Sequence, residues 1–404
     1  MMVTFFLALL ASSAMLTAIM AQQPQELKVN ITILHSATAE GAVCLDGSPP
    51  AYHLDQGYGS GLLSWIIVVD GGGWCSSISD CQHRSNSGLG SSTNTLPPQV
   101  TFSGILHDDS RINPDFYNWN RVRVRYCDGS SFTGDVEDVD PDTKLYYRGA
   151  RIFRAIMNDL SRKGMQTAEN AILTGTSAGG LATILNCDKF KSLLPDDARV
   201  KCVADAAFFI NAKAISGTLD IQDEYRRVVT LHGSAKNLPL SCTSIMEPSL
   251  CFFPRNVVPY VQTPFFIINS HYDSWQIIQN TNSRLVTFWS LNSEYLDPQH
   301  IWKHCKSHIS NCTFIQRMII QGYGVEFLKA FLGLTPSFTR GYFITSCYSH
   351  GEIVWTSYWF SPTSPRVLNK TIAEAVADWY FDRAGFHQYI HPYPCARDCA
   401  LSTS

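Results

Sequence analysis

AILTGTSAGG, residues 171–180, indicates the class of fold, because a short apolar strand runs directly into a G-x-S-x-G turn. A helical pattern follows over Leu181–Asn186. In such a turn the glycines flank a bend too tight for side chains, and the serine is held in a strained conformation at the carboxyl edge of a sheet. The N-terminus of the following helix favours negative charge that develops there. Ser177 is therefore a candidate nucleophile, and a buried serine in a glycine-rich turn is the structural alternative.

Short runs rich in β-branched residues lie on both sides of this turn and predict buried strands of a parallel sheet. An amphipathic stripe over residues 148–163 predicts a helix between the second and third runs. Near the C-terminus, Thr371-Ile-Ala-Glu374 is a capping-box pattern that begins another amphipathic helix. This β-α-β rhythm predicts an α/β domain with a doubly wound, mostly parallel sheet. The expected strands are Ser64–Val69, Val122–Tyr126, Ala171–Thr174, Val200–Ala204 and Thr263–Asn269.

The chain reads as one domain with an insertion. After the N-terminus no stretch is apolar over a full membrane span, and no internal repeat or low-complexity linker divides the sequence. We therefore expect a single domain over residues 22–404. Residues 285–334 interrupt the rhythm with Cys305, Cys312 and a GYG break at residues 322–324, so we expect helical insertions there that lie over the site.

Composition excludes several classes of protein. The 31 Lys and Arg residues nearly balance 34 Asp and Glu residues among 404, so charge favours neither a nucleic-acid partner nor an anionic membrane. Hydrophobic residues make up 45% of the chain and charged residues 16%, which argues against disorder. The 13 cysteines show no zinc-finger spacing and indicate an oxidising compartment.

The first residues read as a secretory signal. Residues 5–20 are almost wholly apolar, Ala21 is small enough to precede a cleavage site, and the polar run QQPQ follows. We expect residues 1–21 to be a cleaved signal peptide, so that no membrane contact remains; a retained anchor is the alternative. N-glycosylation motifs, which have meaning only in a secreted protein, occur at Asn30, Asn311 and Asn369.

A second glycine-rich turn, DGGGWC at residues 70–75, follows another apolar strand. In serine hydrolases a loop of this kind donates backbone N–H groups to the oxyanion of the tetrahedral intermediate, together with the N–H of the residue after the nucleophile. The donors here would be the backbone amides of Gly72, Gly73 and Ala178. The structural alternative is a glycine turn closed by a small disulfide loop, and both interpretations can hold together.

A nucleophilic serine needs a base, and the base needs an orienting acid. In this fold the acid and the histidine follow the serine in that order, on loops after strands. Asp273 stands just past one expected strand, and Asp205, just past another, is the alternative acid. For either, a helix N-cap or a surface ion pair is the structural alternative. His350 lies downstream of both acids and is the candidate base, because the other histidines break the chain order, adjoin Asp273, or lie in the insertion and the tail.

Ordered motifs along the chain carry a resemblance to a known family. They are GGGWC (71–75), YCDGSSF (126–132), GTSAGGLA (175–182), LHGSAKNLP (231–239), YDSWQ (272–276) and SCYSH (346–350). In this order they resemble plant pectin acetylesterases, a family related to the animal Wnt deacylase Notum, and the resemblance extends over residues 40–400.

The resemblance implies an α/β-hydrolase fold and removal of acetyl groups from galacturonate residues of cell-wall pectin. Carried over position by position, Ser177 is the nucleophile, His350 the general base and Asp273 its orienting partner. It further implies a secreted monomer of the cell wall and apoplast that needs no metal or cofactor. Its partner would be acetylated pectin, as homogalacturonan or rhamnogalacturonan.

The sequence also departs from this family. Many relatives carry Cys where Thr176 stands, Glu where Asp70 stands, and Cys-Gln where Gly351-Glu352 follows the histidine. Loss of one half of a bridge would explain the odd number of cysteines and leave one thiol free. We expect the remaining cysteines to pair locally, and the shortest loops are Cys75–Cys81, Cys242–Cys251 and Cys305–Cys312.

Two other functions remain open at this point. A lipid or protein deacylase of the Notum type would need a deep apolar acyl pocket, whereas acetylated pectin would need a shallow pocket in a basic, polar cleft. A catalytically silent polysaccharide-binding protein could keep the fold with a misaligned site.

Overall fold

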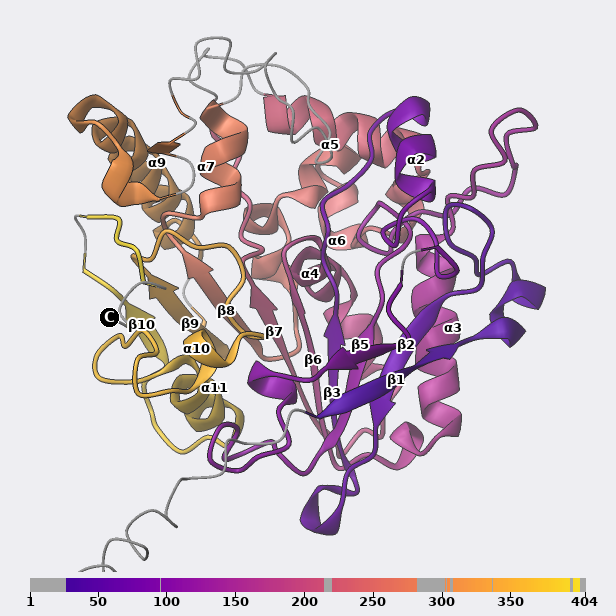
Figure 1. Cartoon of the computed structure of the whole chain (residues 1–404), viewed down its shortest axis with the longest axis horizontal. Helices are drawn as coiled ribbons and strands as arrows, with labels where there is room; N and C mark the ends of the chain where they lie inside the picture. The colour runs from indigo at the N-terminus through magenta and orange to yellow at the C-terminus, as the bar shows by residue number, and fades with distance from the viewer. Residues whose placement is uncertain are drawn as a thin grey trace, which may run out of the picture.

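The computed structural model describes residues 27–94, 96–213, 220–281, 302, 304–305, 308–335, 337–392 and 395–399 (Figure 1). The predicted signal peptide, residues 1–21, lies outside the described residues. The same holds for residues 282–301, which include the first part of the predicted insertion.

One ten-stranded sheet runs through the molecule in the order β10-β9-β8-β7-β6-β3-β5-β2-β1-β4 (Figure 1). The strands from β10 to β5 in this order are parallel, while β2, β1 and β4 extend one edge in antiparallel fashion. The predicted α/β class with a mostly parallel sheet is therefore confirmed. The strands are β1 Lys28–Ile33, β2 Ala51–Asp55, β3 Ser64–Val69, β4 Gln99–Thr101, β5 Asn120–Val124, β6 Asn170–Thr176, β7 Arg199–Asp205, β8 Phe265–Ser270, β9 Arg340–Thr345 and β10 Gln388–Ile390.

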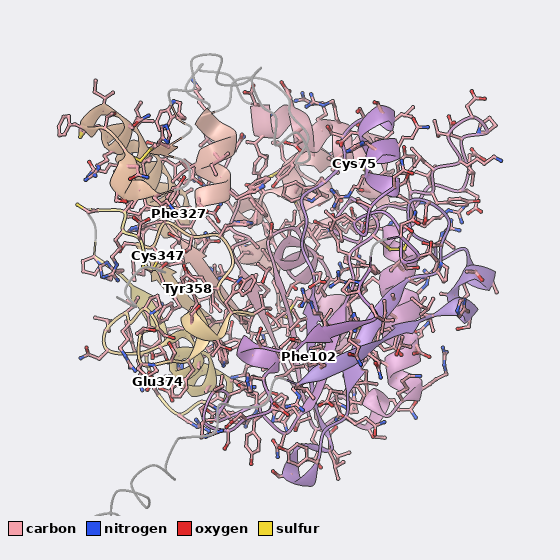
Figure 2. All side chains as sticks on the ribbon, viewed as in Figure 1. Cys75, Phe102, Phe327, Cys347, Tyr358 and Glu374 are labelled. Carbon is pink, nitrogen blue, oxygen red and sulfur yellow. A yellow bond between two sulfur atoms is a disulfide. The ribbon has the colours of Figure 1, made fainter. Side chains whose placement is uncertain are left out.

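Successive side chains of a strand point to opposite sides, and every residue of β3, β8 and β9 is buried, so the sheet is covered on both faces there. In β3, Ile67 belongs to one apolar core and Ile66 to the other. The first core lies under α3 Gly149–Arg162, α4 Ala178–Lys191, α5 Asp220–Leu231 and α9 Phe314–Leu332. The second lies under α10 Thr356–Trp359, α11 Ile372–Tyr380 and residues 102–119. Figure 2 labels one aromatic residue of each core, Phe327 and Phe102.

The helices expected on either side of the nucleophile turn are present, and so is the C-terminal helix. At the start of α11 the Glu374 N–H donates to Thr371 Oγ1 at 3.3 Å, and the Thr371 N–H donates to the Glu374 carboxylate at 2.7 Å. The predicted capping box is therefore confirmed. Shorter α-helices are α2 Ile78–Ser85, α6 Leu240–Thr243 and α7 Ser274–Thr281. The 3₁₀ turns are η1 His35–Glu40, η2 Gly59–Gly61, η3 Gly104–Leu106, η4 Met165–Thr167, η5 Ser234–Asn237, η6 Pro248–Phe252, η7 Pro254–Asn256, η8 Val258–Tyr260 and η9 Ile309–Asn311.

The predicted break at residues 322–324 is wrong, because α9 is continuous through them. A Cβ atom at Gly324 would lie 2.5 Å from a ring carbon of Tyr272, so this glycine lets the helix pack against the loop after β8. Further along, Phe327 and Phe331 make edge contacts with Phe208. This part of the predicted insertion is thus a core helix that connects β8 with β9.

Disulfides join twelve of the cysteines in the described chain. The three predicted local pairs are confirmed, and Cys395 is the free, exposed thiol. A Cβ atom at Gly351 would lie 2.6 Å from Thr176 Cγ2, so the loop after His350 lies against the nucleophile turn. The free thiol that the odd number of cysteines predicts is therefore Cys395. The longer-range bridges are Cys44–Cys127, Cys187–Cys202 and Cys347–Cys399.

Along the part of the chain that the structure describes, no helix combines the length and the apolar character needed to cross a bilayer.

Candidate active site

Ser177 stands on a sharp turn between β6 and α4. Its backbone angles are φ 61° and ψ −126°, in a region that a residue with a side chain rarely adopts. Its N–H donates to the Asp205 carbonyl at 2.9 Å, which ties the turn to the end of the neighbouring strand β7. The side chain is 9% exposed at the N-terminus of α4, where negative charge is favoured. These are the strain and location that the G-x-S-x-G pattern predicts.

His350 and Asp273 meet on the loops after β9 and β8. His350 Nδ1 lies 3.0 Å and 2.9 Å from the two carboxylate oxygens of Asp273. Asp273 is fully buried, and its Oδ1 also accepts the N–H of Gln276 in the first turn of α7. This carboxylate is therefore fixed in place, and it fixes the tautomer and orientation of the imidazole.

The loop that carries His350 lies directly on the nucleophile turn, as the close approach of Gly351 to Thr176 shows. His350 Nε2 is buried and has no hydrogen-bond partner among the described residues. Hydrogen bonds between a catalytic base and its nucleophile are often long before substrate binds. Trp275 stacks on the imidazole, with ring centroids 5.8 Å apart and an interplanar angle of 26°.

Burial lowers the pKa of His350, but the charge and the hydrogen bond of Asp273, with a smaller contribution from Asp205, outweigh burial. The net effect is a pKa above the ordinary value for histidine. A base with a raised pKa binds its proton more tightly, and this suits a residue that must accept a proton from a hydroxyl group.

Asp205, the alternative acid, has a different position. Its Oδ2 accepts the N–H groups of Glu352 and Ile353 at 2.7 and 3.0 Å, and the hydroxyl of Thr176 at 3.0 Å. Asp205 therefore holds the His350 loop against the nucleophile turn, while Asp273 is the acid on the imidazole. Sequence reasoning did not assign Asp205 this role.

Glu352 adds a second buried carboxyl group to the same place. Its Oε1 accepts hydroxyl groups of Ser349 and Thr345 at 2.7 and 3.1 Å. Burial raises the pKa of Asp205 to about 6, although its three donors act in the opposite direction. Burial, and then the charge of Asp205, raise the pKa of Glu352 to about 7.

The glycine turn after β3 passes over the nucleophile turn. A Cβ atom at Gly71 would lie 2.3 Å from the Thr176 carbonyl oxygen, so only glycine allows this approach. The Gly72 carbonyl accepts Nη2 of Arg84 at 2.6 Å, and the Gly73 carbonyl accepts the Tyr126 hydroxyl at 2.8 Å.

The directions of these carbonyls determine where the neighbouring N–H groups point. The described peptide bonds are all trans, so each N–H is directed opposite to the carbonyl of the preceding residue. The N–H groups of Gly73 and Trp74 are thus turned away from Arg84 and Tyr126. The sequence predicts Gly72 and Gly73 as the donors in this turn, and these carbonyl directions set the orientation of the N–H groups of Gly73 and Trp74.

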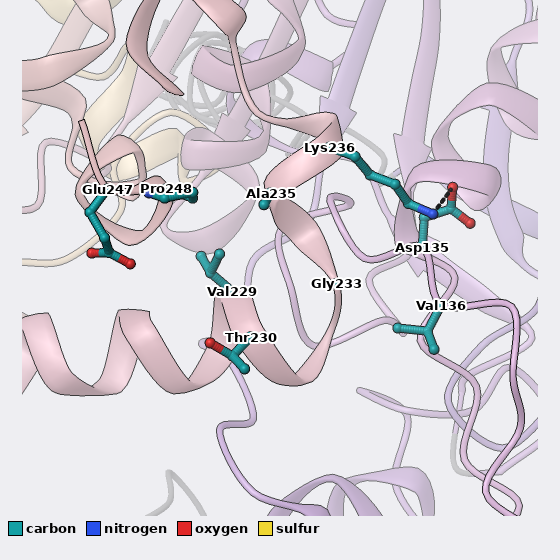
Figure 3. Close-up of a pocket in the computed structure, with 9 residues that line it drawn as sticks. All are labelled: Asp135, Val136, Val229, Thr230, Gly233, Ala235, Lys236, Glu247 and Pro248. Carbon is teal, nitrogen blue, oxygen red and sulfur yellow. Dashed lines mark ion pairs between the residues drawn. The ribbon is translucent and has the colours of Figure 1, made fainter. Parts of the chain in front are cut away.

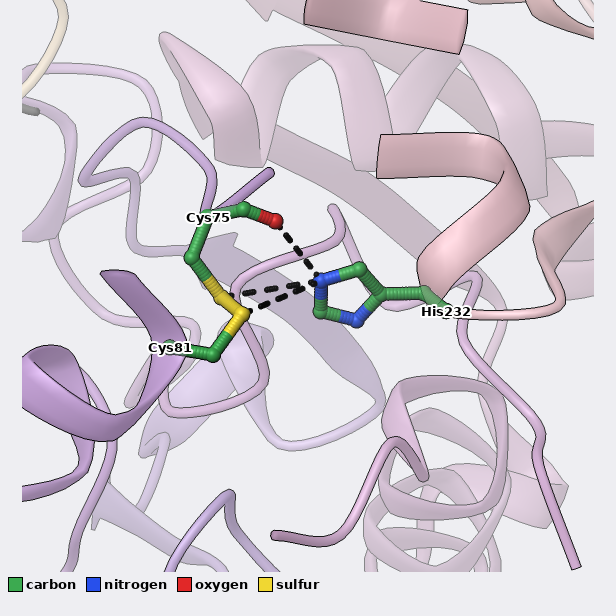
Figure 4. Close-up of side chains that lie close together, drawn as sticks. All are labelled: Cys75, Cys81 and His232. Atoms are coloured by element: carbon green, nitrogen blue, oxygen red, sulfur yellow. Dashed lines mark hydrogen bonds between the residues drawn. A yellow bond between two sulfur atoms is a disulfide. The ribbon is translucent and has the colours of Figure 1, made fainter. Parts of the chain in front are cut away.

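Cys75, at the end of this turn, forms the expected disulfide with Cys81. His232 lies beside it, and its Nε2 is 2.9 Å from the Cys75 carbonyl oxygen (Figure 4). The two sulfur atoms and this nitrogen are close enough to ligate a metal ion, but the sulfurs are bonded to each other. Burial lowers the pKa of His232 to about 4, so its ring is uncharged where it contacts the end of the turn.

A surface pocket of about 480 Å³ lies at the C-terminal end of α5 (Figure 3). Its lining includes Lys236 and Asp135, which form an ion pair at 3.3 Å. None of its lining residues belongs to the predicted site. The asparagines of the glycosylation motifs, Asn30, Asn311 and Asn369, are all exposed.

A strained serine between strand and helix, near a histidine paired with a buried aspartate at the carboxyl edge of a mostly parallel sheet, defines a protein of the α/β-hydrolase class. Comparison with known proteins gives the family. The chain belongs to the pectinacetylesterase family, whose model matches residues 22–400, and this makes it a carboxylic ester hydrolase.

Individual relatives agree with this assignment. The chain is 50% identical over 358 residues to pectin acetylesterase 11 of Arabidopsis thaliana, covering 89% of each protein. It is 48% identical to pectin acetylesterase 7 of the same plant, covering 93% of this chain and 94% of the relative. It is 27% identical to the mouse palmitoleoyl-protein carboxylesterase NOTUM, over 88% of this chain and 65% of the relative.

The fold is also similar to that of a solved structure. The Wnt deacylase Notum from Drosophila superposes with a TM-score of 0.73 at 20% sequence identity, covering 92% of this chain and 98% of the other. This likeness concerns the fold alone.

Proposed function

We propose that this protein is a serine esterase that hydrolyses acetyl esters on galacturonate residues of cell-wall pectin. The observation that carries the proposal is the strained conformation of Ser177 at the N-terminus of α4, next to the loop that holds His350 on Asp273. Relatives at 41–50% identity are named pectin acetylesterases, which supports pectin as the substrate.

In this mechanism Ser177 attacks the acetyl carbonyl while His350 Nε2 takes its proton. Asp273 holds the imidazole and stabilises its positive charge. The oxyanion is stabilised by backbone N–H groups of Ala178 and of the turn that includes Gly72 and Gly73. His350 then returns the proton to the departing sugar hydroxyl, which leaves an acetyl group on the serine.

Deacylation repeats these steps with water. His350 removes a proton from a water molecule, the water attacks the acetyl-serine, and acetate leaves as Ser177 recovers its proton. Each step uses only protein groups, so we propose no metal and no cofactor.

The aromatic residues around the candidate site support a short acyl group. The Trp74 ring makes edge contacts with Phe209 and Tyr225, each at 5.1 Å, and with Trp275 at 5.7 Å. Trp74 belongs to the glycine turn after β3, and Trp275 stacks on His350. These rings fill the space next to the glycine turn and next to His350, which suits an acetyl group better than a long acyl chain.

We further propose a secreted monomer in the cell wall. The disulfides of the described chain and the exposed asparagines of the glycosylation motifs fit an oxidising compartment. Residues 1–21 would direct export. Treatment of the secreted protein with an N-glycosidase should lower its mass, and N-terminal sequencing should begin at Gln22.

The experiment is a measurement of acetate release from acetylated pectin, beside a series of p-nitrophenyl esters of increasing chain length. Ser177→Ala should abolish turnover of the active substrates, because in the proposed mechanism the acyl group is carried by the Ser177 hydroxyl. Ser192→Ala is the matched control, since Ser192 is exposed at the opposite end of α4.

Each outcome has a distinct meaning. Ser177-dependent release confined to short acyl chains supports the proposal, and full turnover in Ser177→Ala contradicts it. Activity only on long chains would favour a deacylase of the Notum type. Binding of pectin with no release from any ester would favour a silent binding protein.

A further inference from the structure

We infer that Arg84 and Tyr126 are positioning residues that hold the oxyanion turn, Gly71–Trp74, in its active conformation. They do so by fixing the carbonyl groups of this turn on the side away from the nucleophile. The inference rests on the proposed function, because it concerns the same site.

Arg84 is unusual in where its charge is placed. It lies in the last turn of α2 and is 1% exposed, yet in the described structure it forms no ion pair. Instead its guanidinium donates to the carbonyls of Gly72 at 2.6 Å and Leu89 at 3.1 Å, and lies 5.3 Å from the centre of the Tyr126 ring. Burial of a charged group is costly, so this placement calls for a local reason.

Tyr126 also binds the turn by a hydrogen bond. Its hydroxyl donates to the Gly73 carbonyl at 2.8 Å and accepts the Ser131 N–H at 2.9 Å. The Ser131 hydroxyl accepts the Trp74 indole N–H at 2.8 Å and donates to the Ala178 carbonyl at 2.7 Å. One hydrogen-bonded frame therefore reaches both sources of oxyanion donors.

The turn needs such a frame because glycine restrains it so little. Gly72 has φ 148° and Gly73 has φ 66°, conformations that glycine enters as readily as others. If the Gly72–Gly73 peptide plane rotated by half a turn, a carbonyl oxygen would replace an N–H at the oxyanion position. The bonds from Arg84 and Tyr126 stabilise one of the two orientations, which is the preorganisation that oxyanion stabilisation requires.

The structure offers controls that match these two residues in chemistry but not in position. Arg340, at the start of β9, is buried and donates to the carbonyls of Thr335 and Val258. Tyr380 is buried, and its hydroxyl donates to the Arg199 carbonyl at 2.8 Å at the start of β7. Both contacts lie at the amino edge of the sheet, opposite the candidate site.

The test compares Arg84→Lys and Tyr126→Phe with Arg340→Lys and Tyr380→Phe, in p-nitrophenyl acetate hydrolysis by the whole protein. Arg84 reaches the Leu89 and Gly72 carbonyls from two separate nitrogens, Nε and Nη2, whereas a lysine carries all its donors on one nitrogen and lacks this planar fork. Loss of one oxyanion donor typically lowers kcat by about 100- to 1,000-fold, so a misaligned donor should lower it by about 10- to 100-fold. KM should stay within about threefold, because the N–H groups act on the transition state.

The readouts separate positioning from general stability. The pH at which kcat/KM is half-maximal should not move in the Arg84 and Tyr126 variants, since His350 and Asp273 are untouched. The control variants should keep their kcat even where their unfolding temperature falls as much as that of the Arg84 and Tyr126 variants. If kcat falls equally in variants and controls, or only KM rises, the inference is wrong. The inference is also wrong if Tyr126→Phe folds with unchanged kcat, even when Arg84→Lys fails to fold.

These results are distinguishable from failure of the proposed function. In that case Ser177→Ala would retain turnover, or the unmodified protein would release no acid from any ester. An active, Ser177-dependent enzyme that is indifferent to Arg84 and Tyr126 would refute this inference alone.

Discussion

Replacing Glu352 with glutamine should remove the loss of stability that ionisation of this side chain is expected to cause between pH 5 and pH 8. The Glu352 side chain is 2% exposed and lies two residues after His350. Its Oε2 is buried without a hydrogen-bond partner among the described residues. Glutamine keeps the shape of the protonated side chain and cannot ionise, so the substitution isolates the effect of the charge.

The magnitude follows from the difference in pKa between the folded and unfolded states. Burial and the charge of Asp205 raise the pKa of Glu352 from 4.5 to about 7. A raised carboxyl pKa stabilises the folded state fully below pH 4.5, and this stabilisation is lost as the pH rises through 7. At about 1.4 kcal/mol per pKa unit the complete loss is about 3 kcal/mol, and most of it falls between pH 5 and pH 8.

The assay is urea unfolding at pH 5, 6, 7 and 8 with the disulfides intact, for the unmodified protein, Glu352→Gln and the exposed control Glu40→Gln. We expect Glu352→Gln to be close to the unmodified protein at pH 5 and more stable by about 2–3 kcal/mol at pH 8. Titrating groups that do not interact with Glu352 cancel in this difference. If the two proteins differ by the same amount at every pH, Glu352 is not buried in its neutral form and the reasoning is refuted.

Two further predictions concern the base and the helix α9. The kcat/KM of the unmodified enzyme should fall as the pH drops through the raised pKa of His350. Asp273→Asn should lower kcat by up to about 10⁴-fold and shift the pH midpoint of any residual activity to lower pH. A pH–rate profile with an unmoved midpoint would count against the pairing of His350 with Asp273. Gly322→Ala should stabilise the protein by about 0.5–1 kcal/mol, because a Cβ atom there meets nothing within 4 Å. Gly324→Ala should destabilise the protein by about 1–3 kcal/mol, because its Cβ atom would collide with Tyr272. Thermal unfolding that ranks the two variants in the opposite order would contradict the packing of α9.

Local patterns in the sequence predicted much of the fold. The strand at Ser64–Val69 has the bounds that its apolar run predicts, and the capping box at Thr371 begins α11. The GYG pattern at residues 322–324 failed as a predictor, because glycine lowers helix propensity equally whether it is exposed or packed against another residue. Only the position of Tyr272 shows that Gly324 is needed for close contact.

By itself the sequence determined the turn that strains Ser177, the glycine turn that passes over it, and the order in which acid and histidine follow. These features depend on residues a few positions apart, whose backbone preferences are local. The family resemblance already predicts Asp273 as the acid, and only the tertiary structure decided that Asp205, the alternative, holds the adjoining loop. It also decided which thiol is free and which carbonyl groups the buried Arg84 guanidinium binds. Such contacts join residues far apart along the chain, and their distances depend on how the whole sheet and its helices pack.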